Sequence, residues 1–337
     1  MDLMSERSSA LNNEDLIKKR QNERFAYILG IFTQFLWSLN GVQMKSFRLY
    51  FPNNDTDNSV MFWRMIIPLT LGYIICKYNN IHIQTFSELK HLNWFLCRNA
   101  VAYIFIIAWV KMYSYFRVST ISVIGGTTPI LIIIISVFLI GEKFYIRYLL
   151  GVFLGIFGSA IIIFNDRKPE SKIQLLNDNL FVGILLGIIN VILVSLSSVG
   201  QKVLTKEGMD IHLQAFYFAS FNVVPAFFFG IFTDKIFSSN WKYIAYIISN
   251  GFLFYIANYF NTLCLRYIAI AKFQPITYLV IVFTFINSAI FLGEHVYFSD
   301  FIGALIIIGF QYYNFTNPPG KNISEIIYLI NNNLNKY

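Results

Sequence analysis

The stretch LGIFTQFLWSLNGVQMK at residues 29–45 has a second version, LGIINVILVSLSSVGQK, at residues 186–202. At this offset of 157 residues, both stretches open with Leu-Gly-Ile, and a serine, a leucine, a valine and a lysine recur further on. In so apolar a chain leucine and isoleucine often match by chance, but lysines and serines rarely do. The pattern predicts an internal repeat, which decides the fold class when it is present.

A second pair of segments supports the repeat. At an offset of 152 residues the matched pairs are Gly141 and Gly293, Glu142 and Glu294, Tyr145 and Tyr297, and Gly151 and Gly303. Because the two offsets are nearly equal, they indicate one duplication that covers most of the chain.

The composition is that of a membrane protein. Hydrophobic residues make up 56% of the chain and charged residues only 13%, with a mean hydropathy of +0.56. The hydrocarbon core of a bilayer takes roughly 20 apolar residues as a helix. The candidate spans are 25–44, 60–76, 92–110, 119–140, 145–164, 180–200, 213–233, 243–265, 273–292 and 296–315.

The sequence therefore predicts an all-α integral membrane protein with about ten transmembrane helices, arranged as two inverted five-helix repeats. The inversion follows because an odd number of helices in each repeat places the second copy upside down in the bilayer. The expected units are an N-terminal tail at 1–24, a first repeat at 25–164, a linker loop at 165–179, a second repeat at 180–316 and a C-terminal tail at 317–337.

The net charge of +8 is spread over the tail and short loops, which favours contact with lipid headgroups over a nucleic-acid partner. Lys18, Lys19 and Arg20 precede the first span, so the N-terminus is predicted to be cytosolic. The membrane is either the plasma membrane or that of an intracellular organelle. The three cysteines lack metal-like or redox-like spacing, and neither a metal nor a cofactor is predicted.

The segment TTPILIIIISVFLIGEK at 127–143 places Pro129 twelve residues before Gly141. This segment resembles the EamA type of the drug/metabolite transporter superfamily, whose repeats end in a proline, an apolar helix and Gly-Glu. In the second copy Ile281 stands where that proline would fall, and Pro275 lies six residues earlier. We therefore expect the breakpoint of that helix to have moved.

Further likeness lies in FWRMIIP around Arg64 and in the segment that follows Arg98, which are similar to the branch of the G-type solute carrier 35 proteins. That motif usually has a glycine where Asn99 stands. The resemblance implies ten helices, two cytosolic termini and a transport function. It implies no substrate, because the superfamily carries solutes from amino acids to nucleotide-linked sugars.

Polar side chains at helical spacing inside the spans are candidates for a solute site near the bilayer midplane. They are Gln34, Trp37, Ser38, Arg98, Tyr103, Thr127, Thr128, Asn190, Ser197, Asn258, Gln274 and Tyr278. The alternative for each is a bond to a neighbouring helix or its own backbone, worth about 0.6 kcal/mol. Structural roles are expected for Pro129, Gly141, Glu142, Gly293 and Glu294.

Arg64 and Arg98 lie inside their spans, where a buried cation needs a partner, an anionic solute or a path to the headgroups. Snorkelling is the favoured interpretation for Arg64, whereas both interpretations stay open for Arg98. The acids and all four histidines fall at loops or span ends, which favours exchange or facilitated diffusion over proton coupling.

These features predict a secondary transporter that moves a small organic metabolite or drug by alternating access, as a monomer or homodimer in the lipid bilayer. The alternatives are a membrane-embedded enzyme and a channel without a transport cycle. An enzyme is not expected, because the sequence has no H-E-x-x-H motif, nucleophile elbow or paired acids within a span.

Overall fold

The computed structural model describes residues 2–51, 57–85, 88–89, 92–116, 118–141, 150, 152–154, 157, 161, 180–233, 241–293 and 298–316, with the side chains of most of these residues from 21 onward. Within these ranges all regular structure is helical. The predicted span 145–164, the linker 165–179 and the C-terminal tail lie largely or wholly outside the described residues.

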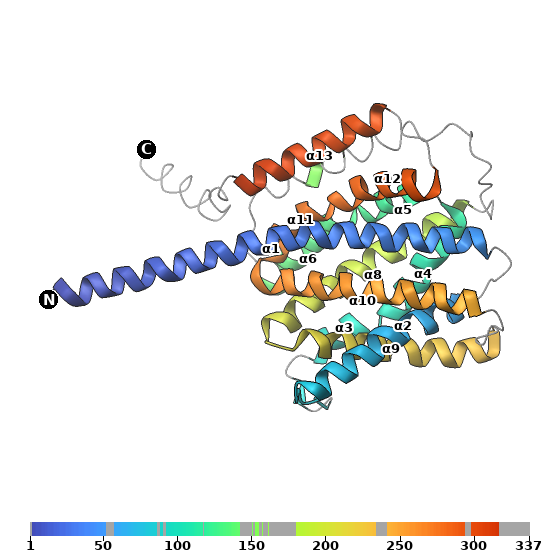
Figure 1. The fold of residues 1–337 in the computed structure, drawn as a ribbon, viewed down its shortest axis with the longest axis horizontal. Coiled ribbons are helices and arrows are strands. Elements are labelled where there is room, and N and C mark those ends of the chain that lie inside the picture. The colour runs from blue at the N-terminus through green and yellow to red at the C-terminus, as the bar shows by residue number, and fades with distance from the viewer. Residues whose placement is uncertain are drawn as a thin grey trace.

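The helices form one bundle, from which the N-terminal part of α1 extends (Figure 1). In the first repeat they are α1 (Asp2–Tyr50), α2 (Asp57–Tyr78), α3 (Leu92–Asn99), α4 (Ala102–Tyr115), α5 (Val118–Gly125) and α6 (Thr128–Ile140). In the second they are α8 (Leu180–Lys206), α9 (Ile211–Thr233), α10 (Trp241–Tyr267), α11 (Ile270–Thr277), α12 (Leu279–Leu292) and α13 (Phe298–Thr316).

Six described stretches are long and apolar enough to cross a membrane. They are Gln21–Tyr50, Asp57–Tyr78, Leu92–Tyr115, Phe181–Lys206, Ile211–Phe232 and Ile270–Leu292. The predicted count of ten is not established by these stretches. Helix α10 has the length but carries Asn250, Asn258 and Asn261, which lower its hydropathy, and it packs against α1, α2, α8 and α9 inside the bundle.

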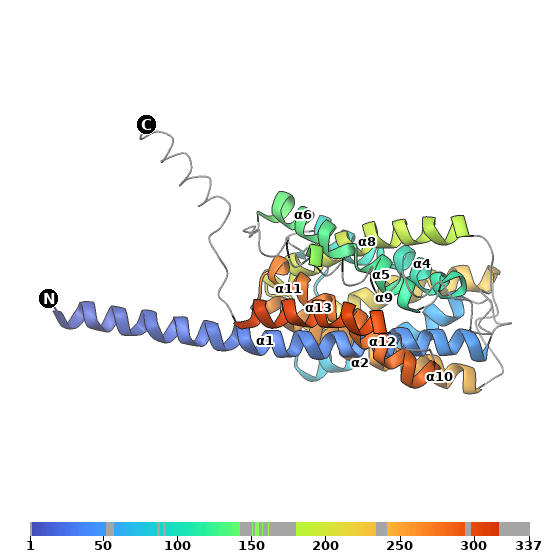
Figure 2. The same cartoon turned by 90° about the horizontal axis from the view of Figure 1, so that it is seen from above.

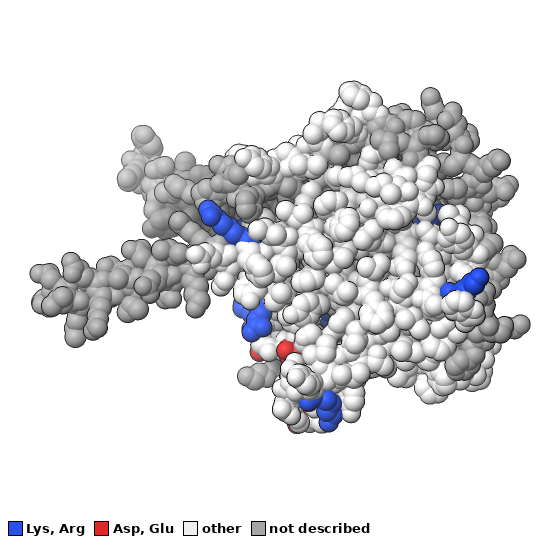
Figure 3. Space-filling model, viewed as in Figure 1, with Lys and Arg blue, Asp and Glu red and all other residues white. Residues whose placement is uncertain are grey.

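The outer surface of the bundle is apolar, as lipid contact requires. Large side chains such as Phe138, Phe181 and Phe232 are more than three-quarters exposed. Figure 3 shows one face on which the Lys and Arg side chains lie toward the ends of the bundle, with an uncharged described surface between them.

Three spans predicted as continuous are broken. The span 92–110 divides into α3 and α4, 119–140 into α5 and α6, and 273–292 into α11 and α12. The last two are the fourth helices of their repeats. Pro129 lies in the first turn of α6, where its missing N–H does no harm. Pro275 lies near the end of α11, one turn before the second break.

The two fourth-helix breaks occupy equivalent positions. Tyr278 separates α11 from α12, and Gly126, 152 residues earlier, lies between α5 and α6. The expectation that the second breakpoint had moved is therefore wrong. Instead, the proline has changed sides, since it follows the break in the first repeat and precedes it in the second.

Each contact between helices of different repeats has a counterpart in which the two repeats exchange roles. Helix α2 packs against its counterpart α9. Helix α1 packs on α10, α11 and α12 of the second repeat, and α8 packs on α3, α4, α5 and α6 of the first. Each repeat therefore packs its first helix against the third and fourth helices of the other.

The first helices of the two repeats, α1 and α8, run in opposite directions (Figures 1 and 2). Lys272, at the start of α11, pairs with Glu23 of α1 at 2.6 Å. Lys202, near the end of α8, donates to the carbonyl of Ile268, four residues before Lys272. The end of α8 therefore lies on the same side of the bundle as the beginning of the bundled part of α1.

The lysines that matched between the repeats have matching roles. The Lys45 ammonium donates to two carbonyls at the end of α4, and the Lys202 ammonium to two at the end of α10. The acceptors are Tyr113 and Phe116 at 2.9 and 3.2 Å for Lys45, and Leu265 and Ile268 at 2.5 and 2.7 Å for Lys202. A cation at a helix C-terminus satisfies carbonyls that lack a partner in the helix.

The matched glycines also have the same role. Gly141 and Gly293 end α6 and α12 in the left-handed conformation, with φ of 64° and 68°. Their N–H groups donate to the carbonyls of Ser136 and Ser288. Such a cap favours glycine because a side chain is strained at positive φ.

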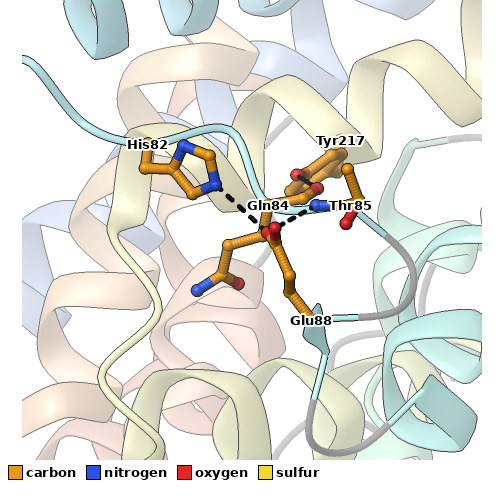
Figure 4. A network of polar contacts seen from close by, with 5 residues as sticks. All are labelled: His82, Gln84, Thr85, Glu88 and Tyr217. Atoms are coloured by element: carbon orange, nitrogen blue, oxygen red, sulfur yellow. Dashed lines mark hydrogen bonds and ion pairs between the residues drawn. The ribbon is translucent and has the colours of Figure 1, made fainter.

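The segment between the apolar helices α2 and α3 is fixed to α9 (Figure 4). The Glu88 carboxylate accepts the Thr85 N–H at 2.9 Å and lies 3.1 Å from His82 Nε2. The Tyr217 hydroxyl of α9 donates to the Gln84 carbonyl. The hydrogen bond from the Thr85 N–H lowers the pKa of Glu88, and the contact with His82 lowers it further.

Candidate functional site: a cavity between the two repeats

A cavity of about 310 Å³ lies among α1, α2, α4, α5, α6, α8, α10, α11 and α12. Both repeats line it. Its volume is at the lower end of the range found for sites that bind small organic molecules.

Half of the predicted site residues line this cavity: Gln34, Trp37, Thr128, Asn190, Gln274 and Tyr278. Gln34 and Gln274 are almost fully buried, and Asn190 donates to the Phe105 carbonyl at 2.8 Å. These polar groups lie on the faces of α1, α8 and α11 that line the cavity.

The remaining predicted residues are held elsewhere by other parts of the protein. Ser38 accepts a hydrogen bond from Asn287 Nδ2 at 2.8 Å. Tyr103 bonds Asn58 and stacks on Phe229. The hydroxyl of Thr127 donates to the Ile124 carbonyl of its own turn.

Arg98, Ser197 and Asn258 form one buried cluster outside the lining of the cavity. The Arg98 guanidinium donates to the Ser197 hydroxyl at 3.1 Å and to Asn258 Oδ1 at 3.2 Å, and lies 4.4 Å from the Phe218 ring centre. Arg98 is only 5% exposed. The cluster joins α3, α8, α9 and α10, so these three side chains hold helices together.

Arg64 does not snorkel, contrary to the interpretation favoured from its sequence position. Its side chain lines the cavity and is only 1% exposed. Nη2 donates to Asn40 Oδ1 at 2.8 Å. The guanidinium carbon lies over the rings of Trp109 and Phe254, whose centres are 4.8 and 4.6 Å away.

Besides Arg64, the sequence-based site omitted Trp109, Tyr113, Phe254 and Asn261, all of which line the cavity. Asn261 lies one turn after Asn258 on α10, so its helical spacing could have identified it as a candidate. The aromatic lining residues could not be singled out from the sequence, because 18% of the chain is aromatic.

The two broken fourth helices meet at the cavity wall. The Tyr278 hydroxyl donates to the Gly126 carbonyl at 2.7 Å, and both residues line the cavity. This bond joins equivalent breaks of the two repeats, at the point where each helix leaves backbone groups without helical partners.

Among the predicted structural residues, Pro129, Gly141 and Gly293 lie at helix ends. Glu142 and Glu294 lie outside the described residues. Across the part of the chain that is described, no three His, Cys, Asp or Glu side chains group in a way that could hold a metal ion.

Long apolar helices and two repeats around a shared cavity define a multi-pass integral membrane protein. The family model described as the EamA-like transporter family matches residues 24–164 and 181–314. The chain therefore belongs to the EamA-like transporter family. The match identifies the family but no branch within it, so the likeness to the G-type solute carrier 35 proteins stays a prediction.

The fold also occurs in solved structures. One, titled "Crystal structure of protein", superposes with a TM-score of 0.66 at 12% identity, covering 86% of this chain and 95% of that chain. At this identity the likeness concerns the fold alone. Nothing matches in a comparison with curated proteins.

Proposed function

We propose that the protein carries a small organic solute across a membrane by alternating access, with its two repeats inverted relative to each other. The bond between Tyr278 and Gly126 supports this best, because it joins the fourth-helix breaks of the two repeats at one cavity. Broken helices at the interface of two repeats form the solute sites of many secondary transporters.

The packing supports two related conformations. Each first helix packs on the third and fourth helices of the other repeat, so exchanging the conformations of the repeats preserves the same set of interfaces. Rocking the repeats about the cavity would open it first to one side of the membrane and then to the other.

The described lining offers little for proton coupling. Its titratable side chains are Arg64, Tyr113 and Tyr278, residue types that ordinarily keep one protonation state near neutral pH. We therefore propose exchange or facilitated diffusion rather than proton symport. The membrane in which the protein resides and the cytosolic location of both termini remain predictions.

Uptake of a metabolite mixture into liposomes that contain the purified protein tests the proposal. We expect uptake of at least one solute to saturate and to accelerate when the same solute is preloaded inside. Flux that rises linearly with concentration, without acceleration by preloading, would indicate a channel. Uptake driven by a pH gradient alone would contradict the absence of proton coupling.

A further inference from the structure

Arg64 is the one charged side chain among the described residues that line the cavity. No ion pair forms with it in the described structure. A buried cation without an acidic partner is unfavourable in an apolar bundle, and it gives the cavity a positive potential that attracts anions.

The Arg64 guanidinium also has N–H donors without an acceptor. Of its N–H groups, Nη2 donates to Asn40, whereas the buried Nε and Nη1 have no acceptor. Buried donors in proteins are nearly always satisfied. An oxyanion is the acceptor that a guanidinium binds most strongly, since both partners are charged.

Arg64 is held in place by an amide pair between α1 and α10. Asn40 accepts from Arg64 and donates to the Asn250 carbonyl at 3.1 Å. Asn250 in turn donates to the Asn40 carbonyl at 3.1 Å. Both asparagines are almost fully buried, so Arg64 is anchored at the interface of the two repeats.

The surrounding rings suit a flat apolar body. Trp109 and Phe254 lie over the guanidinium and also line the cavity, as does Trp37, which makes an edge contact with Phe254 at 5.5 Å. The unpaired Nε and Nη1 groups are buried in this conformation. A solute therefore reaches them by displacing one ring and taking its place against the guanidinium.

We propose that the cavity selects organic anions with a single negative charge and a flat apolar body, and that Arg64 binds the anionic group. This inference rests on the transport function proposed above and names its substrate class. A single charge is specified because one cation balances it, whereas a second negative charge would be left unpaired in the cavity.

Binding to the full-length protein in lipid nanodiscs tests the proposal with four probes of similar size: benzenesulfonate, benzenesulfonamide, phenyltrimethylammonium and phenyl phosphate. We expect the wild type to bind benzenesulfonate at least about tenfold more tightly than its neutral sulfonamide isostere. Phenyl phosphate, largely doubly charged at pH 8, should bind less tightly than benzenesulfonate, and the ammonium compound least.

Arg64→Gln should remove the preference for the sulfonate while binding of the sulfonamide persists. Arg64→Lys should keep part of the preference, because it keeps the charge but loses the planar donors. Lys77→Gln is the matched control, since Lys77 lies on the same helix, exposed and outside the cavity lining. This control should behave as the wild type.

The proposal is overturned if the wild type binds none of the probes, or binds the sulfonamide, the ammonium or the phosphate as tightly as the sulfonate. It is also overturned if folded Arg64→Gln protein keeps the preference. The probe series on the wild type decides even if that variant does not fold. Anion binding without saturable uptake would contradict the transport proposal alone, whereas uptake without anion preference would contradict only this inference.

Discussion

Gly251 sets how closely α2 and α10 approach each other. A Cβ at this position would lie 2.4 Å from the Arg64 carbonyl oxygen, so Gly251→Ala must separate the two backbones. We expect a loss of about 1–3 kcal/mol of folding stability, measured as a lower melting temperature in detergent. Gly309→Ala is the control, because nothing lies within 4 Å of its Cβ. Equal melting temperatures for the two variants would contradict the close approach.

The repeat-matched lysines make a second prediction. Replacing Lys45 or Lys202 by methionine leaves two helix-end carbonyls without their ammonium donor. Each change should reduce stability by about 2 kcal/mol, the value typical of a hydrogen bond to a charged group. Thermal unfolding in detergent measures it. Lys206→Met, at the exposed end of α8, should have little effect, and a large effect there would contradict the assigned roles.

The role of an individual residue was only partly predictable. Matched lysines and glycines in the sequence identified positions whose roles are also matched in the structure. The sequence favoured snorkelling for Arg64 and left Arg98 open, because their depths in the spans are similar and their roles depend on neighbours distant in sequence. Asn40 and two rings surround Arg64, whereas Ser197 and Asn258 bond Arg98.

Among the elements, long apolar helices were predicted well and their interruptions poorly. Hydropathy does not register the breaks at Gly126 and Tyr278, because the residues on both sides remain apolar. Pro275 and Pro129 carry the signal, but a proline is compatible with a break before it or after it. The bond that joins the two breaks, from Tyr278 to Gly126, links different repeats and leaves no mark in the local sequence.

The loop between α2 and α3 should loosen in acid. Because folding lowers the pKa of Glu88, the contribution of its carboxylate is complete above the ordinary value of 4.5 and is lost as the pH falls through the folded value. Hydrogen–deuterium exchange should show the Thr85 amide losing protection, relative to its intrinsic rate, over that range.

Glu88→Gln should reduce the same protection already at neutral pH and make it independent of pH. Glu207→Gln, after the end of α8, is the control and should leave the Thr85 amide as in the wild type. Unchanged protection in Glu88→Gln would show that Glu88 does not hold this loop.

At the scale of the whole molecule, the sequence predicted a duplicated membrane bundle because duplication leaves matched residues along the chain. The wall of the cavity was less predictable, because it combines side chains from nine helices. Helical spacing identifies the polar face of one helix but not the helix opposite. Ser38 and Gln34 lie one turn apart on α1, yet Ser38 bonds Asn287 whereas Gln34 lines the cavity.

The opposite orientation of the repeats is most directly measured at the ends of α1 and α8. In protein whose native Cys76, Cys97 and Cys264 are replaced, single cysteines at Tyr50 and Glu207 mark these ends. In intact cells or vesicles, a membrane-impermeant maleimide should label only one of the two positions, and both after permeabilisation. Labelling of both positions from the same side would contradict the inverted arrangement and, with it, alternating access by exchange of the repeats.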